Sequence, residues 1–216
     1  MSTGTANDPV RRKRMTAEAR REVIELAATD VFAERGYHGA SIDEIAKRSG
    51  VTAPVVYDHF NSKKELHLRL IERHYAELRA VWGGFFPGSK PLEERMARAF
   101  DAWFAYVQGH PYALRMLFRD TTGDPDLRAA HHEIEAESRE ALLPLLAGEL
   151  DAASASGPAD VETLEMTWEA LRGALQAIAL WWAEHPRTPR SRVVATAMQA
   201  VWIGLDGVGR GERWHQ

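Results

Sequence analysis

The amino-acid sequence predicts an all-α fold of about nine helices. Apolar residues recur at helical spacing along most of the chain, and no stretch of useful length shows the alternation that marks a half-buried β-strand. Glycine and proline gather where the periodic segments end. The chain has 216 residues and 45% of them are apolar, which is enough for a hydrophobic core in one medium-sized or two small domains.

The composition excludes several classes of protein. The chain contains no cysteine, so it has no disulfide framework, no thiolate zinc site and no cysteine nucleophile. No stretch approaches 18 consecutive apolar residues, and the N-terminus lacks the apolar core of a signal peptide. We therefore expect a soluble, cytoplasmic protein that does not insert into a membrane.

The net charge of −4 is distributed unevenly along the chain. Residues 1–75 hold 13 Lys and Arg against 11 Asp and Glu, a net of +2, whereas the remaining residues hold 14 against 20, a net of −6. A nucleic-acid partner would therefore bind the N-terminal part of the protein.

The first helix is expected over about residues 17–35. Gly36 follows as its stop, because glycine tolerates the backbone conformation that a helix end requires. This helix should be the scaffold under the next two helices. Its apolar side consists of residues at i, i+3, i+4, i+7 and i+8, namely Ile24, Ala27, Ala28, Val31 and Phe32.

Two short helices joined by a tight turn come next. Ser41 and Glu44 form a Ser-x-x-Glu capping box before the first of them, and Gly50 ends it. Thr52 can cap the second helix, and Pro54 falls in its first turn, where the missing N–H has no intrahelical partner. Such a pair is typical of a helix-turn-helix, whose second helix enters the major groove of DNA. The alternative is an ordinary helical hairpin in an all-α core.

The outer side of the second helix carries no long or basic side chain. We expect Ala53, Pro54 and Val55 to contact thymine methyl groups. His59 or Asp58 could address a base edge. These side chains would read the DNA sequence.

A second capping box, formed by Ser62 and Glu65, begins a helix that should extend to about residue 81. Lys63 and Lys64 lie in its first turn, where they oppose the helix dipole. Their position favours a bound phosphate that backbone N–H groups and ammonium groups share. A solvated charge pair is the alternative. Because this helix has no break, it should connect the DNA-binding part to the rest of the molecule.

Residues 17–73 resemble the N-terminal DNA-binding domain of the tetracycline-repressor (TetR) family of transcription regulators. The resemblance implies a C-terminal domain that binds an effector and dimerises. By position it makes Tyr57 and Lys63 contacts to the phosphate backbone, and it places Ala53, Pro54, Val55 and His59 at the bases. The most specific pieces are residues 32–37, residues 42–51, and Tyr57-x-His59-Phe60 followed by Ser62-Lys63-x-Glu65-Leu66.

Two positions depart from the family pattern. Many members carry a basic or polar residue at the position of Ala53 and a glycine at that of Pro54, a difference that concerns the operator sequence and not the fold. The DNA-binding residues expected from the sequence are Arg12, Arg14, Ser41, Thr52, Ala53, Pro54, Val55, Tyr57, His59 and Lys63.

Four cations at residues 11–14 directly precede the first helix. We expect a flexible basic arm there, in which Arg12 and Arg14 contact phosphates or enter a minor groove. A merely solvated tail is the alternative. The expected organisation is a disordered arm at 1–15, a helix-turn-helix domain at 16–62, an effector-binding and dimerisation domain at 63–210, and a tail at 211–216.

A loop rich in glycine and proline at residues 83–91 precedes the C-terminal helices. The first of these helices ends at Gly109-His110-Pro111, and a short one spans 111–118. The next helix runs to Leu150, with Pro144 kinking or splitting it. A linker of small residues at 151–157 and two long helices, about 159–185 and 191–208, complete the chain.

The last two helices are apolar on two sides, so each needs two partners. We expect them to form a four-helix homodimer interface, and two-fold symmetry then predicts a near-palindromic DNA site. A monomeric core that buries the same residues is the alternative. The stripes are Leu164, Trp168, Leu171, Leu175, Ile178 and Trp182; Ala170, Gly173, Ala177 and Trp181; and, on the last helix, Val194, Ala197, Met198, Val201, Trp202 and Leu205 with the small residues Ala200 and Gly204.

Seven tryptophans raise the question of a ligand cavity in the C-terminal part. Apolar pockets with a few polar groups suit small hydrophobic molecules, so we expect an apolar or aromatic effector of unknown identity. Its binding would shift the helix that begins at Lys63 and release a dimeric repressor from its operator. An ordinary core is the alternative. The candidate contacts are Trp103, Phe104, Val107, Met116, Trp168 and Leu171, with Gln176 or Tyr112 as polar anchors.

An enzymatic function is not expected. The sequence lacks Gly-x-Ser-x-Gly, His-Glu-x-x-His, a P-loop and a dinucleotide fingerprint. His131-His132-Glu133 is the best metal-like cluster, but adjacent histidines on a helix point about 100° apart, which favours a solvated face. We expect no catalytic residue, no metal and no cofactor. A ligand-dependent activator and a sequence-indifferent architectural DNA-binding protein are the alternative functions.

Overall fold

The computed structural model describes residues 15–85, 89–118, 123–153 and 160–202. Nine α-helices and one π-helical turn make up the secondary structure of these residues, which include no strand. The all-α prediction is therefore confirmed. Several features that the sequence singled out lie outside the described ranges, namely the four cations at 11–14 with Arg12 and Arg14, the pair Gly204 and Leu205, and the tail at 211–216.

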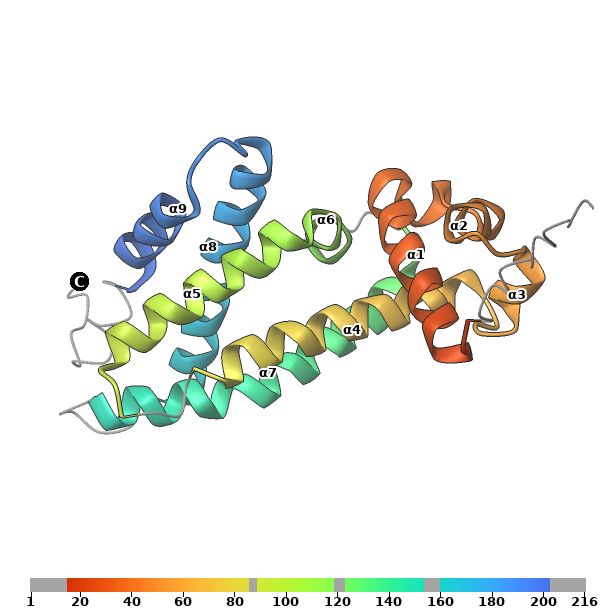
Figure 1. The fold of residues 1–216 in the computed structure, drawn as a ribbon. Helices are drawn as coiled ribbons and strands as arrows, with labels where there is room; N and C mark the ends of the chain where they lie inside the picture. The colour runs from red at the N-terminus through yellow and green to blue at the C-terminus, as the bar shows by residue number, and fades with distance from the viewer. Residues whose placement is uncertain (1–14, 86–88, 119–122, 154–159, 203–216) are drawn as a thin grey trace, which may run out of the picture.

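Three helices form the N-terminal part of the molecule, at one end of Figure 1. α1 spans Ala17–Gly39, α2 spans Ile42–Ser49 and α3 spans Ala53–Tyr57. α1 kinks at Gly36, whose φ of 67° and ψ of 174° lie outside the helical region. The regular part of α1 therefore ends where the sequence predicts, and one further turn follows the kink.

α4 spans Lys63–Gly83 and runs from the N-terminal part into the rest of the molecule (Figure 1). α7, Pro125–Ala153, lies along α4, and these two helices make the most extensive helix-to-helix contact among the described residues. Pro144 does not split α7 as the sequence allowed. It lies on the exposed side of the helix, where water can bind the carbonyl that loses its N–H partner. α7 also continues past Leu150 into the expected linker.

The remaining elements are α5 (Leu92–Gly109), α6 (Pro111–Phe118), α8 (Val161–Glu184), α9 (Arg190–Ala197) and η1 (Met198–Trp202). Of these helices, α5, α8 and α9 pack toward the other end of the molecule, whereas α6 packs against α1 (Figure 1). The helix expected over about 191–208 begins at Arg190 and changes to a π-helical turn at Met198, and its expected end lies outside the described residues. Val193, Ala197 and Val201, which are spaced four residues apart, are buried along one side of this segment.

One hydrophobic cluster extends from the N-terminal helices into the C-terminal part. The large stripe expected on α8 is buried, apart from Ile178, which is partly buried. No helix in the described part of the chain combines the length and the apolar character needed to cross a membrane. The largest fully buried side chains are Ile24, Val31, Ile45, Val56, Phe60, Leu66, Leu70, Ile71, Phe100, Phe104 and Leu127.

Candidate functional site

The turn between α2 and α3 has the geometry that the sequence predicts. The Ser41 hydroxyl accepts a hydrogen bond from the Glu44 N–H at 3.2 Å. Gly50 adopts the left-handed conformation with φ 70° and ψ 24°, and the Val51 N–H donates to the Ala46 carbonyl at 3.0 Å. Thr52 differs from the expectation, because its side chain makes no capping hydrogen bond to α3.

α3 presents a short outward face. Thr52, Pro54 and Tyr57 are exposed, and 53% of the Tyr57 surface is accessible to solvent. Ala53, Val55 and His59 are half-buried. The helix is held from beneath by Val56 and Phe60, which are fully buried. The exposed hydroxyl groups and the proline edge are therefore available to a partner that lies against this face, whereas Ala53 and Val55 could offer only part of their surface.

Ion pairs fix α2 against α1. Arg48 donates to both carboxylate oxygens of Glu34 at 2.8 Å, a bidentate geometry. Glu44 accepts from Arg35 at 2.9 Å. The hydrogen bonds from Arg48 hold the pKa of Glu34 below its usual value. α2 is thus oriented by side chains as well as by its buried face.

Lys63 has protein partners that the sequence did not suggest. Its ammonium group donates to the carbonyl oxygens of Tyr37 at 2.8 Å and Ala40 at 3.0 Å, and it lies 4.6 Å from the centre of the Tyr37 ring. The Lys63 ammonium group, whose charge is unfavourable at the start of α4, is therefore stabilised by two carbonyl oxygens at the end of α1. One ammonium hydrogen is left for a phosphate, and the phosphate role stays a prediction. Lys64 lies 3.8 Å from a carboxylate oxygen of Asp126.

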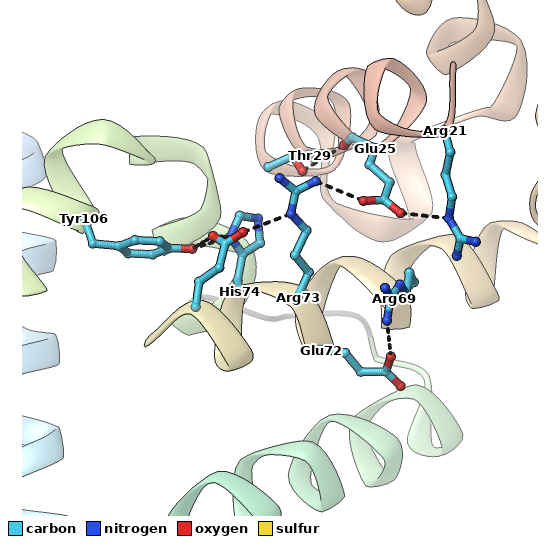
Figure 2. Close-up of polar contacts among 9 residues, drawn as sticks. Arg21, Glu25, Thr29, Arg69, Glu72, Arg73, His74 and Tyr106 are labelled. Carbon is cyan, nitrogen blue, oxygen red and sulfur yellow. Dashed lines mark hydrogen bonds and ion pairs between the residues drawn. The ribbon is translucent and has the colours of Figure 1, made fainter. Parts of the chain in front are cut away.

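A polar network joins α1, α4 and α5 between the two ends of the molecule (Figure 2). Arg73 donates to Glu25 at 2.9 Å and to Glu77 at 3.0 Å. The Tyr106 hydroxyl donates to Glu77 at 2.9 Å and also contacts His74 Nδ1. The sequence did not predict this network, because only its pairs within one helix, such as Arg73 with Glu77, are readable along the chain, whereas Arg73 with Glu25 and Tyr106 with Glu77 join different helices.

Burial and hydrogen bonding set the protonation states in this network. Burial lowers the pKa of His74 to about 4. Burial raises the pKa of Glu77, but hydrogen bonds from Arg73 and Tyr106 outweigh it and hold that pKa below its usual value. With the Tyr106 proton given to Glu77, we assign the neutral His74 proton to Nδ1, which leaves the buried Nε2 without a hydrogen-bond partner.

A cavity of about 70 Å³ lies in the C-terminal part, among α4, α5, α6, α7 and α8. Of the eight effector contacts expected from the sequence, Trp103, Trp168 and Leu171 line this cavity. Four of its described wall residues come from α4, although the sequence predicted only a connecting role for this helix. The described residues of the wall are Tyr75, Leu78, Arg79, Trp82, Trp103, Phe118, Glu135, Ser138, Leu142, Trp168, Leu171, Arg172 and Leu175.

The other expected effector contacts lie elsewhere. Phe104, Val107 and Met116 are buried in the core and do not line this cavity, and their contact with an effector stays a prediction. Gln176 donates to the Phe118 carbonyl at 3.4 Å, next to the wall. The side chain of Tyr112 is outside the part that the structure describes.

The histidine pair on α7 does not form a solvated face. His131 is buried and lies 3.3 Å from the Tyr75 hydroxyl, whereas His132 is exposed. The two rings divide between interior and solvent because adjacent helical side chains diverge. Within the described ranges, no three His, Cys, Asp or Glu residues gather closely enough to hold a metal ion.

The small-residue stripe of α8 lies on the surface. Ala170, Gly173 and Ala177 are exposed, and 49% of Trp181 is accessible. Trp181 also lines a groove of about 490 Å³ between α8 and α9. An indole ring beside exposed small residues is the composition of a surface that a second protein surface could cover.

Comparison with known proteins identifies both halves of the chain. Residues 24–70 match the family described as bacterial regulatory proteins, tetR family, and residues 92–204 match the tetracyclin repressor-like C-terminal domain. The chain is similar to the HTH-type transcriptional activator FasR of Mycolicibacterium smegmatis, with 35% identity over 120 residues. That match covers 55% of this chain and 55% of FasR, about half the length of each.

Two solved structures share the fold. The fatty acid degradation regulator FadR from Bacillus halodurans superposes with a TM-score of 0.74 at 19% identity, covering 89% of this chain and 98% of that one. The transcriptional regulator FadR from Bacillus subtilis, solved in complex with stearoyl-CoA, gives a TM-score of 0.68 at 17% identity over 89% and 99% of the two chains.

Proposed function

Because the chain belongs to the TetR family and is a DNA-binding transcriptional regulator, we propose that it binds a near-palindromic operator as a homodimer and releases it when a small apolar effector binds. It is a regulator and not an enzyme. The single observation that carries the proposal is the course of α4. This helix forms one wall of the cavity and also packs against α1, which in turn packs against α2 of the helix-turn-helix.

Because the cavity is small, a ligand that enters it should displace α4. A volume of about 70 Å³ holds about two water molecules, whereas ligand pockets commonly measure about 300–1,000 Å³. An effector must therefore push the walls apart, and α4 supplies Tyr75, Leu78 and Trp82 to those walls. Displacement of α4 acts on α1 through Lys63 and Arg73, so the separation of the two α3 helices in a dimer changes.

DNA contact is proposed for the outward face of α3 and the chain that precedes α1. Tyr57 and Lys63 would hold phosphates, while Ala53, Pro54, Val55 and His59 would face the bases. Ser41 and Thr52 would add hydroxyl contacts to the backbone. Arg12 and Arg14 would add phosphate contacts beside the duplex.

The proposed effector carries an acyl chain or a similarly apolar body. Three tryptophans and four leucines line the cavity, which suits a hydrocarbon. The names of the two FadR relatives, and the stearoyl-CoA in one of them, support the same class of ligand.

The sign of regulation has two candidates. We propose a repressor, whose operator overlaps the promoter that it controls. The name of FasR, an activator, favours an activator as the second candidate. A reporter gene placed behind the native promoter, with and without this protein, separates them, because deletion raises expression for a repressor and lowers it for an activator.

Selection from randomised duplexes at about 150 mM salt tests the DNA-binding proposal, because nonspecific phosphate attraction is weak there. We expect enrichment of a near-palindrome with half-sites about one helical turn apart or a multiple of it. Binding without enrichment, lost steeply as salt rises, would instead indicate an architectural DNA-binding protein.

Reciprocal linkage tests the effector proposal. A ligand that weakens operator binding must bind the protein–operator complex more weakly by the same factor. Equal ligand affinity for the free and the operator-bound dimer contradicts the proposed release.

A further inference from the structure

We propose that Arg79 binds the carboxylate of the effector, so that the ligand is a monoanionic, amphipathic carboxylic acid with an apolar body. This inference rests on the proposed function, because it assigns the ligand chemistry of the same cavity.

Arg79 lies at a boundary between two spaces. Its side chain lines the cavity of about 70 Å³ and also a groove of about 710 Å³ between α4 and α7. Trp82, Trp103 and Trp168 form aromatic walls on the cavity side. A ligand that buries its apolar body among these rings and leaves its polar end at the boundary meets the guanidinium group of Arg79.

The charge of Arg79 has no counter-ion in the part of the chain that the structure describes. Its hydrogen-bond partner there is the neutral hydroxyl of Ser138, which accepts from Nη1 at 2.6 Å. The Ser138 hydroxyl gives its own proton to the Ile134 carbonyl at 3.0 Å, so the oxygen is a fixed acceptor. Ser138 therefore positions the guanidinium group without neutralising it, and the half-buried charge gains from an anion.

The second arginine of the described cavity wall differs in this respect. Arg172 contacts carboxylate oxygens of Glu135 at 2.8 Å and Glu169 at 2.5 Å. Its charge is already compensated inside the protein. An anionic ligand therefore gains more from Arg79 than from Arg172.

The surroundings of Arg79 favour a single carboxylate over a head group with several negative charges. The planar guanidinium fork matches a carboxylate in a bidentate geometry. Four carboxylates line the outer groove; Glu72 and Glu77 pair with Arg69 and Arg73, and Glu133 and Glu137 add further negative charge. Like charges disfavour each other at short range, so a polyphosphate that extended into the groove would be repelled.

Titration of the full-length dimer with dodecanoate, 1-dodecanol and dodecanoyl-CoA tests the assignment, with tryptophan fluorescence as the signal. We expect the wild type to bind dodecanoate at least tenfold more tightly than the alcohol or the thioester. Arg79→Gln should weaken dodecanoate binding by about 10- to 100-fold, because a charge-assisted hydrogen bond is lost, and should leave dodecanol binding unchanged.

Arg69→Gln is the matched control. Arg69 lies on the same helix and lines the groove but not the cavity, so this variant should bind all three ligands as the wild type does. Equal weakening of acid and alcohol by Arg79→Gln would overturn the carboxylate assignment and leave the effector cavity intact. Tighter binding of dodecanoyl-CoA that is insensitive to Arg79→Gln would do the same. Failure of all three ligands to bind the wild type would overturn the proposed effector class together with this inference.

Discussion

Lys63 shows that the partner of a charged side chain depends on what folds beside it. Its place in the first turn of α4 opposes the helix dipole, yet its ammonium group lies against two carbonyl oxygens at the end of α1. Tyr57 is the opposite case, because neighbouring residues leave half of it exposed on α3. These two residues, expected to play the same role, therefore differ in how much a substitution disturbs the fold.

Tyr57→Ala should weaken operator binding without lowering stability. The loss of one phosphate hydrogen bond in each half-site costs about 1 kcal/mol per protomer, or roughly 30-fold in the affinity of the dimer, and the effect should be similar for different operator sequences. Fluorescence anisotropy with a selected operator and thermal unfolding measure the two quantities. Phe60→Ala, at a fully buried neighbour, should instead lower stability by about 3–5 kcal/mol. An unchanged operator affinity for Tyr57→Ala would remove Tyr57 from the interface.

Arg73→Leu should destabilise the protein by about 2 kcal/mol. The substitution takes one cation from Glu25, whose side chain is only 8% exposed, while Arg21 at 3.2 Å remains as a weaker partner. Arg69→Leu is the control, since Arg69 pairs with Glu72 in solvent and should change stability by less than about 0.5 kcal/mol. Urea unfolding of both variants measures the loss of stability. Equal losses for the two variants would show that the network does not contribute to stability.

His74 should make the protein less stable in mild acid. Its folded pKa of about 4 lies below the usual 6.5, so the unfolded chain binds the extra proton and folding stability falls as the pH drops between these values. Relative to pH 7.5, about 3 kcal/mol should be lost by pH 4 from this residue. The charged groups around His74 shift its pKa in opposite directions. Glu77 favours the protonated ring and raises the pKa, whereas Arg73 and His110 disfavour it and lower the pKa.

His74→Gln should flatten this dependence. Chemical denaturation of the wild type and of the variant between pH 4 and pH 7.5 measures it, with the other histidines common to both proteins. Parallel stability curves for the two proteins would show that His74 does not titrate as stated.

The short elements of the N-terminal part depend on two glycines that differ in backbone conformation. Gly50 is left-handed, a region that other residues can enter at a cost of about 1–2 kcal/mol. Gly36 combines φ 67° with ψ 174°, a region that is essentially restricted to glycine. An added Cβ meets no atom within 4 Å at either position, so only the backbone cost differs.

Gly36→Ala should therefore destabilise the protein by more than Gly50→Ala, by about 1–3 kcal/mol against about 1–2 kcal/mol. Gly50→Asn should cost least, because asparagine tolerates the left-handed region. Thermal unfolding of the three variants tests this order. A larger loss of stability for Gly50→Ala would mean that the backbone conformation of the turn between α2 and α3 matters more for stability than the kink of α1.

In the whole molecule, the exposed face of α8 should decide the oligomeric state. Trp181→Asp places a charge on a surface that we expect a second copy to cover, so the dimer should dissociate and operator affinity should fall by 100-fold or more. Sedimentation velocity and operator binding measure the two effects. Leu26→Asp is the control, because Leu26 is 55% exposed on α1, far along the chain from α8. A wild-type protein that is monomeric at micromolar concentration would contradict the dimer.

The local features of this protein follow from its sequence because their causes are local. Capping boxes, glycine stops and apolar periodicity involve residues within one or two helical turns, and they determined the all-α class, the helix boundaries near Ser41, Gly50 and Ser62, and the family resemblance. The buried stripe of α8 was predictable for the same reason.

Tertiary structure decided which of these residues meet. Arg79 with Ser138, Arg73 with Glu25, and Lys63 with the end of α1 are pairs from distant parts of the chain. Periodicity assigns a side chain to a helix face but not to a particular neighbour, so it could not distinguish Trp103, which lines the cavity, from Phe104, which is core. The cavity and the polar network exist only where helices remote in sequence pack against α4, and that packing is the physical reason why the sequence alone did not reveal them.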